Sequence, residues 1–307
     1  MINTLMLGSL IMMLIGLFYF IVRHQNTAAF MALLGKLHYP HLDYTESVIG
    51  ANFDRMNTTW VHPNLTGGVM ALFVPFTFYY GLYQTGWRKL FALTVTALGM
   101  MVLLFSISRG AIVSLVLVLL WLSKMRAPFA ARILQVGVVL SITAVLAYPP
   151  LQSRLSTMFS AKNASTQVRM DEYKKFPEGI ARHPLGIGFK TEPPVDKDLL
   201  GISNLWLNYM YKMGFIGMLM FIAVTRVWWK EVRPVANLHQ LDKEHGLWIG
   251  SLSGILAALL TGFFDHYFSF ATVLIALFWM MVAINLDSAR RLKAQNSPLL
   301  LKKRFFV

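Results

Sequence analysis

The sequence has no cysteine and little charge. Of its 307 residues, 14% are charged and 56% are hydrophobic, and the mean hydropathy is +0.54. About a quarter of the residues in an average soluble domain are charged. Without cysteine the chain has no disulfide framework, thiol nucleophile or thiolate metal site. A soluble core could not bury so much apolar surface, so the composition excludes an ordinary soluble domain.

Apolar runs bounded by charges or turn residues predict the fold. Most of them approach the ~20 helical residues that cross a ~30 Å hydrocarbon layer. The first run lacks a basic leading region and a small-residue cleavage site, which favours a retained span over a signal peptide. The predicted fold class is therefore all-α, a polytopic transmembrane helical bundle of about eight spans with one long structured outer loop. The predicted spans are 1–22, 67–83, 90–105, 111–122, 133–148, 205–227, 247–264 and 268–286.

Basic residues in the loops predict the orientation. With the N-terminus inside, the inner loops and tail carry fifteen of the 28 basic residues but only four of the 14 acidic ones. Both termini are therefore predicted to be cytoplasmic. Most of the net charge of +14 is then explained by topology and lipid headgroups, so membrane lipids are expected partners and nucleic acid is not.

Three regions follow from this topology. Residues 1–50 hold the first span and an outer interfacial segment, 51–286 form the main transmembrane domain, and 287–307 are a basic cytoplasmic tail. The outer loop at 149–202 is too long for a mere connection and is predicted to carry function. An amphipathic helix is expected within it, around Ala164–Arg182.

Arg109 lies between two apolar runs with almost no polar linker. A guanidinium at this depth is costly unless it faces a cavity or an anion, which makes Arg109 a catalytic candidate. The alternative is a turn arginine that extends to the lipid headgroups. The next residue, Gly110, suits either a tight reversal or the close approach of a ligand backbone.

The long outer loop supplies Arg169, Arg182 and His183. Arginine binds phosphate in bidentate fashion and stays charged at any working pH, so two arginines from different segments could bind a diphosphate. The alternative is that these loop arginines are solvated. The pair Gly186-x-Gly188 is too short for a nucleotide fingerprint and is interpreted as a turn.

His266 follows Asp265 at a predicted outer membrane edge. A histidine beside a carboxylate could accept a proton during catalysis, and interfacial anchoring is the alternative. No histidine or carboxylate spacing resembles a metal site. Neither a metal nor another cofactor is therefore expected.

Several segments occur in a familiar order along residues 51–286. This order resembles the O-antigen ligase and polymerase family of bacterial cell envelopes, the Wzy-type proteins. The segments are Asn52-Phe53, His62-Pro63-Asn64, Ser108-Arg109-Gly110-Ala111, Arg169 with Tyr173, His183-Pro184-Leu185-Gly186-Ile187-Gly188, Asn204, and Gly214-Phe215-Ile216-Gly217.

The resemblance implies an activity. Family members transfer a glycan from a polyprenyl diphosphate carrier to an acceptor, which is lipid A core for ligases and another carrier-linked glycan for polymerases. They work at the outer, periplasmic face of the bacterial cytoplasmic (inner) membrane without metal or nucleotide. Arg109 and Arg169 match the two family arginines, which would stabilise the leaving diphosphate. The residues expected to bind substrate are Asn64, Arg182, His183, Ser203 and Asn204.

The chain departs from the ligase pattern at Ser203, where ligases place a histidine. Serine cannot act there as a base unaided, so His266, His183 or Glu192 would substitute, or the protein is not a ligase. This departure favours a polymerase over a ligase. The resemblance also implies more spans before the first motif than this chain carries. The competing hypothesis is a non-enzymatic handler of carrier lipid, such as a transporter or flippase, or a degenerate family member.

Cysteine labelling can test the predicted topology. We expect Lys162→Cys, in the outer loop, to react with an impermeant reagent added from outside. Lys230→Cys should react only after the membrane is opened, because it lies in a predicted inner loop. Labelling of Lys230→Cys from outside would contradict the orientation.

Overall fold

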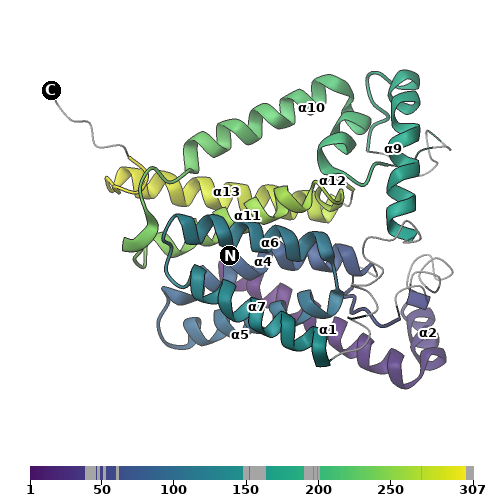
Figure 1. The fold of residues 1–307 in the computed structure, drawn as a ribbon, viewed down its shortest axis with the longest axis horizontal. Helices are drawn as coiled ribbons and strands as arrows, with labels where there is room; N and C mark the ends of the chain where they lie inside the picture. Colours follow the sequence, from purple (N-terminus) through teal and green to yellow (C-terminus); the bar gives the residue numbers. More distant parts are fainter. Residues whose placement is uncertain are drawn as a thin grey trace. The chain divides into compact units, whose positions relative to one another are not determined.

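The structure is a computed structural model that describes residues 1–38, 46, 49–50, 53–59, 62–147, 152, 164–189, 196, 199, 201–270 and 272–301. Within these ranges every regular element is a helix (Figure 1), which confirms the predicted all-α fold. Asn52, Lys162 and Glu192, named above, lie outside the described residues.

Each predicted span overlaps a helix, and the last one overlaps two, so the chain is a polytopic α-helical membrane protein. Five helices are long and apolar enough to cross a membrane, namely α1 (Ile2–Gln25), α4 (Pro63–Leu82), α5 (Gly86–Ser106), α10 (Leu205–Val232) and α13 (Thr272–Ala294). Three further predicted spans coincide with α6 (Arg109–Lys124), α7 (Ala130–Ala147) and α11 (His245–Thr261). The remaining elements are α2 (Thr27–Lys36), α9 (Ala164–Arg182), η1 (Leu238–Gln240) and α12 (Tyr267–Phe270).

The chain forms two compact units. Unit 1 comprises Met1–Leu115 and Asp242–Ala258, and unit 2 comprises Val116–Leu241 and Leu259–Val307. Each unit contains part of the sequence pattern described above. Asn64 and Arg109 belong to unit 1, whereas the other candidate site residues belong to unit 2.

Unit 1 is built around α4. Most residues of α4 are buried, and α5 packs along this helix. On α11, Gly246, Gly250 and Gly254 follow one another at four-residue spacing. A Cβ atom at Gly250 or Gly254 would lie 2.7 or 2.3 Å from a backbone oxygen of α4. Small residues let helix backbones approach closely in membranes, so this stripe fixes α11 against α4.

Unit 2 is built around α10, which packs against α9, α12 and α13. Figure 1 shows the long segment of α10 running beside α13. Within this contact Trp228 donates its indole N–H to Asn285 Oδ1 at 3.0 Å. The bond satisfies two buried polar groups that would otherwise destabilise the packing.

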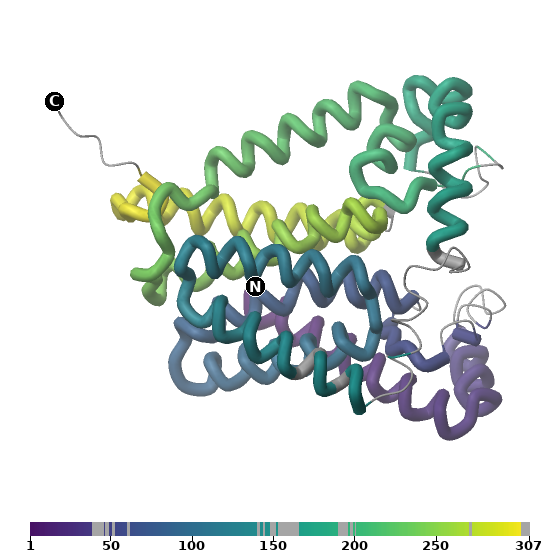
Figure 2. Tube along the Cα trace, in the orientation of Figure 1, coloured from purple at the N-terminus to yellow at the C-terminus, as the bar shows by residue number. Residues whose placement is uncertain are grey.

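α10 is broken at Gly214, where φ is 73° and ψ is −178°. The tube in Figure 2 changes direction at the start of the long green helix. The segment that follows α9 fills the break, because the N–H groups of Ile187 and Gly188 donate to the carbonyls of Tyr211 and Lys212 at 3.1 and 2.8 Å. Carbonyls that lose their helical partners therefore regain partners from another segment, as an apolar environment requires.

The break corrects the predicted continuous span at 205–227. Residues 215–232 form the longer of two helical segments, and residues 205–213 form a separate segment before it. Lys212, which the sequence placed inside the sixth span, belongs to this preceding segment.

The predicted turn at Gly186-x-Gly188 is confirmed, with φ values of 85° and 76°. The two glycines differ in their surroundings. A Cβ at Gly186 would lie 2.5 Å from both Gly214 N and Lys212 O, whereas a Cβ at Gly188 would meet nothing within 4 Å. Gly186 is therefore required both by its backbone conformation and by close backbone contact, and Gly188 by its conformation alone.

Paired alanine substitutions can test this contact. We expect Gly188→Ala to lower the free energy of unfolding by about 1 kcal/mol, the cost of a left-handed non-glycine residue. Gly186→Ala should cost about 3 kcal/mol or more, since two backbones must also separate. Thermal melts in detergent would measure both changes. Equal losses of unfolding free energy would contradict the close backbone contact between Gly186 and the break in α10.

Candidate functional site

One face of α9 is polar in its first half and apolar in its second. Arg169, Glu172 and Tyr173 lie on this face at three- and four-residue spacing. Phe176 and Ile180 continue it one and two turns further along. The two apolar side chains pack against a buried cluster made of Leu199, Ile202 and Tyr211. This packing fixes the rotation of α9 and with it the direction of the polar half.

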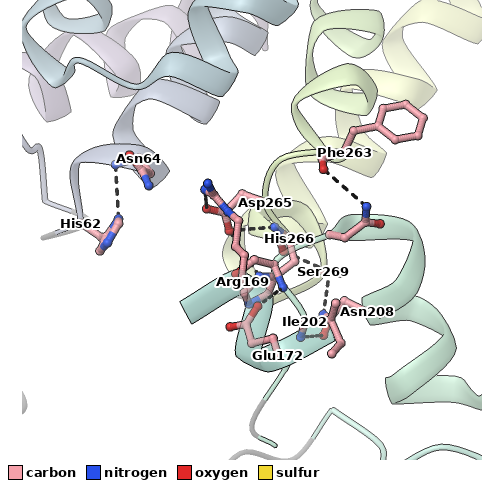
Figure 3. A network of polar contacts seen from close by, with 12 residues as sticks. His62, Asn64, Arg169, Glu172, Ile202, Asn208, Phe263, Asp265, His266 and Ser269 are labelled. Carbon is pink, nitrogen blue, oxygen red and sulfur yellow. Dashed lines mark hydrogen bonds and ion pairs between the residues drawn. The ribbon is translucent and has the colours of Figure 1, made fainter. Parts of the chain in front are cut away.

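The polar half of α9 meets the start of α10 and the turn before α12. We call this group the α9 cluster, and its members are Arg169, Glu172, Tyr173, Ser203, Asn204, Asp265 and His266. Figure 3 shows Arg169 extending toward Asp265 and His266. The structure thus brings together four of the residues that the sequence singled out, namely Arg169, Ser203, Asn204 and His266.

Asp265 lies between the two candidate catalytic groups of the cluster. Its Oδ2 is 3.7 Å from Arg169 Nη2, and its Oδ1 is 3.3 Å from His266 Nδ1. The backbone N–H of His266 also donates to Asp265 Oδ1 at 2.8 Å. The Asp265 side chain is 12% exposed and that of Arg169 is 26% exposed, so solvent screens the pair only in part.

The environment keeps Asp265 ionised. Burial alone would raise the pKa of this carboxyl, but hydrogen bonds and charge from His266, with help from Tyr267, outweigh burial and lower it. A carboxylate facing Nδ1 favours the tautomer with the proton on that nitrogen. His266 Nε2 is then the ring atom suited to accept a proton, and a Cβ at Gly201 would lie 3.6 Å from it.

The first turn of α10 is tied to the turn before α12. Asn204 caps the helix, because its Oδ1 accepts the N–H groups of Trp206 and Leu207 at 3.0 and 3.1 Å, and its Nδ2 donates to Phe263 O at 3.4 Å. Asn208 donates to Ser269 Oγ at 2.8 Å. These bonds hold His266 close to the beginning of α10.

Ser203 is held through its backbone. Its N–H donates to Glu172 Oε2 at 2.7 Å, and its carbonyl accepts the hydroxyl of Tyr173 at 3.4 Å. Burial raises the pKa of the Tyr173 hydroxyl, so the hydroxyl remains a donor. Ser203 is the residue before the Asn204 cap, and its two backbone contacts join α9 to the start of α10.

Arg182 and His183 meet a different carboxylate. Asp196 Oδ2 is 2.9 Å from Arg182 Nη2 and 3.7 Å from His183 Nε2, and it accepts the hydroxyl of Tyr211 at 3.0 Å. Thirteen residues separate Arg182 from Arg169 on α9, which corresponds to about 20 Å of helix. The structure therefore groups these two predicted substrate-binding residues with Asp196 and apart from the α9 cluster.

In unit 1, Arg109 is the first residue of α6 and is partly buried. A tight reversal was one of the two roles predicted for Gly110, and that role is wrong. Gly110 lies within α6, and Ile107 makes the turn in the left-handed conformation with φ 49°. Close packing against α4 accompanies the turn, since a Cβ at Gly67 would lie 2.3 Å from Ser108 Cβ.

Asn64 is the second residue of α4. Its side-chain oxygen accepts a hydrogen bond from Arg55 Nη2, and its N–H donates to His62 Nδ1 at 3.3 Å, as Figure 3 also shows. The contacts of Asn64 within the protein do not test its predicted role in substrate binding, which stays a prediction.

Sequence reasoning missed Arg55, Glu172 and Asp196. Each acts through a partner distant in the chain, so no local pattern identified it. Asp265 was noted only for its place beside His266. Among the residues that the structure describes, no three His, Cys, Asp or Glu side chains are grouped as a metal site would require.

Comparison with known protein families supports the resemblance. A family model described as O-antigen ligase matches residues 92–222. The match includes most site residues and leaves Asn64, Asp265 and His266 outside. Searches of curated proteins and of solved structures found no match.

The Asp265 carboxylate gives a pH-dependent prediction. Because its pKa is lowered from 3.8 in the folded protein, its contribution to stability is present above pH 3.8 and is lost as the pH falls below that value. We expect Asp265→Asn to cost about 2 kcal/mol at pH 7. The difference from the wild type should shrink between pH 4 and pH 3 in thermal melts.

Asp171→Asn is the matched control, since Asp171 is on α9, is exposed and pairs only loosely with Lys174 at 4.0 Å. It should leave stability unchanged. A wild type and an Asp265→Asn variant with the same melting temperature at pH 7 would show that Asp265 does not hold the cluster together.

Proposed function

We propose that this chain, of which residues 92–222 match a family model described as O-antigen ligase, is a membrane glycosyltransferase. The substrate is a glycan linked to a polyprenyl diphosphate, and the acceptor is another glycan or lipid A core. The proposed site lies at the outer, periplasmic face of the bacterial inner membrane. The reaction uses no metal, because arginines supply the positive charge.

The arrangement of Arg169, Asp265 and His266 is the observation that supports this proposal most. In the proposed reaction an acceptor hydroxyl attacks the anomeric carbon, the bond from that carbon to the diphosphate oxygen breaks, and the diphosphate leaves with the electron pair. Arg169 stabilises the negative charge on the diphosphate. His266 Nε2 takes the hydroxyl proton, and Asp265 stabilises the imidazolium that forms.

The role of Arg109 is proposed from its sequence motif. Arg109 and Arg169 match the two arginines of the family, and we propose that both serve the leaving diphosphate. Asn64, Arg182, His183, Ser203 and Asn204 are proposed to bind or position the glycan substrates. For Arg182 and His183 the contact with Asp196 supports a fixed orientation of both side chains.

We favour a polymerase over a ligase. Ligases carry a histidine at the position of Ser203, and in this chain that position contributes backbone contacts to Glu172 and Tyr173. A proton acceptor from another segment, His266, would serve an acceptor that approaches differently from lipid A core.

A non-enzymatic carrier-lipid transporter remains the second candidate, because broken helices such as α10 are typical of transporters. In transporters the freed backbone groups of a broken helix bind the cargo. In this chain the carbonyls of Tyr211 and Lys212 at the break accept backbone N–H groups of the protein itself. Because these carbonyls already have partners within the protein, they are not available to bind a cargo, which favours the enzyme over the transporter.

Complementation of a gene deletion tests the function. We expect loss of the gene to leave surface polysaccharide as single repeat units on a gel, as for a polymerase, whereas a ligase mutant would accumulate long unattached chains. Arg109→Lys and Arg169→Lys should each lower transfer on the order of a hundredfold, since an ammonium cannot provide the bidentate geometry of a guanidinium. The double variant should lose less than the product of the single losses.

Arg132→Lys is the control, because Arg132 is an exposed arginine at the start of α7 and lies in no motif. The Arg132→Lys variant should restore the full length of the surface polysaccharide in the deletion strain. Full activity of Arg109→Lys and Arg169→Lys, with both proteins folded in the membrane, would favour the transporter.

A further inference from the structure

Unit 1 contains a segment, Phe53–Thr59, that we call the strap. Arg23 of α1 is 1% exposed and donates to the carbonyls of Phe53 and Arg55 at 2.8 and 3.0 Å and to Asn57 Oδ1 at 3.0 Å. Three hydrogen bonds from one guanidinium thus fix the strap on α1.

Further contacts fix the strap to α4 and to a second place on α1. Thr58 N–H donates to Thr66 Oγ1 of α4 at 3.0 Å. At Gly16 of α1 an added Cβ would lie 2.8 Å from Thr58 Cα, so the strap backbone lies directly on that helix. A segment without regular structure is therefore fixed to both helices by hydrogen bonds and close packing.

The strap ends α5. The last carbonyls of any helix have no partners within the helix and carry partial negative charge. Met56 N–H donates to Phe105 O at 2.9 Å. Arg55, which is 5% exposed, donates through Nε to Ser106 O at 2.8 Å and through Nη2 to Ile107 O at 3.4 Å. The guanidinium provides both the donors and the positive charge that this helix end requires.

Arg109 begins α6 two residues after Ile107. The left-handed turn at Ile107 determines where α6 starts, and Arg55 binds the carbonyl of that turn together with Asn64 Oδ1 of α4. A planar group with several fixed donors can join three acceptors from two helices in one geometry, which an ammonium on a flexible stem does not reproduce.

We propose that Arg55 is a positioning residue for Arg109. It fixes the α5–α6 junction, so that the guanidinium of Arg109 is held in place for the leaving diphosphate before the substrate binds. The proposal rests on the proposed function of Arg109 in transfer. Preorganised positive charge of this kind acts mainly on the transition state, because no reorganisation is needed as charge develops.

Hydrogen exchange tests the positioning independently of catalysis. We expect Arg55→Lys to raise amide exchange on the order of tenfold at residues 107–112, since it removes one or two hydrogen bonds at the junction. Arg88→Lys is the control, because Arg88 is an exposed arginine of α5 near the Trp87 ring, at 5.8 Å from its centroid, and it should leave exchange unchanged. If Arg55→Lys does not accumulate, Arg55→Gln gives the same comparison without a buried unpaired charge. Unchanged exchange at 107–112 overturns the proposal.

Kinetics on reconstituted protein with lipid-linked glycan tests the link to Arg109. We expect Arg55→Lys to lower kcat about tenfold with little change in KM, and to cause no further loss when Arg109→Lys is already present. A general loss of structure would instead multiply with the Arg109→Lys effect, and that result overturns the proposal while leaving Arg109 functional. A fully active Arg109→Lys variant overturns both the role of Arg109 and the role of Arg55 as its positioning residue.

Discussion

The need to satisfy backbone polar groups where helices end in an apolar environment governs the structure. Three such places in the described part of the chain lie close to candidate site residues. Arg55 binds the free carbonyls at the end of α5, Asn204 accepts the free N–H groups at the start of α10, and the turn at 186–188 donates to the carbonyls at the break of α10. Unsatisfied, each of these groups would cost several kcal/mol in hydrocarbon. Arg109, His183, Ser203 and Asn204 lie within a few positions of these places, whereas Arg169 and His266 do not.

Charge follows the same constraint. A partly buried charge is stable only beside an opposite charge or several hydrogen-bond partners, which are acceptors for an arginine and donors for a carboxylate. Asp265 meets this requirement for Arg169 and His266, and Asp196 does so for Arg182 and His183. Each of the two carboxylates therefore organises a separate group of side chains. Both groups place a histidine beside the carboxylate that holds an arginine. The proposed chemistry uses the first group, because the family resemblance assigns Arg169 to the leaving diphosphate.

Much of the fold could be predicted because membrane spans and amphipathic helices depend on local patterns. The bounds of α9 agree with the predicted helix, since its polar and apolar residues alternate with helical periodicity. The break in α10 was missed, because Gly214 is a single glycine within an apolar run and its conformation depends on a turn 28 residues earlier. The turn at Ile107 was missed for a similar reason. A β-branched residue rarely adopts a positive φ, and it does so here next to a carbonyl that Arg55 binds.

The candidate site was predicted in its composition and not in its connections. Arg169, Ser203, Asn204 and His266 were named from motifs, but nothing in the sequence shows that Asp265 joins Arg169 to His266 or that Glu172 binds the backbone of Ser203. These contacts bear on the residue that replaces the missing ligase histidine. Asn208 accepts the N–H of Ile202 at 3.3 Å and donates to Ser269, whose hydroxyl in turn donates to His266 O. A chain of hydrogen bonds thus connects the residue before Ser203 to the histidine. In the proposed reaction, the base that replaces the ligase histidine would thus lie in a turn that the start of α10 holds in place.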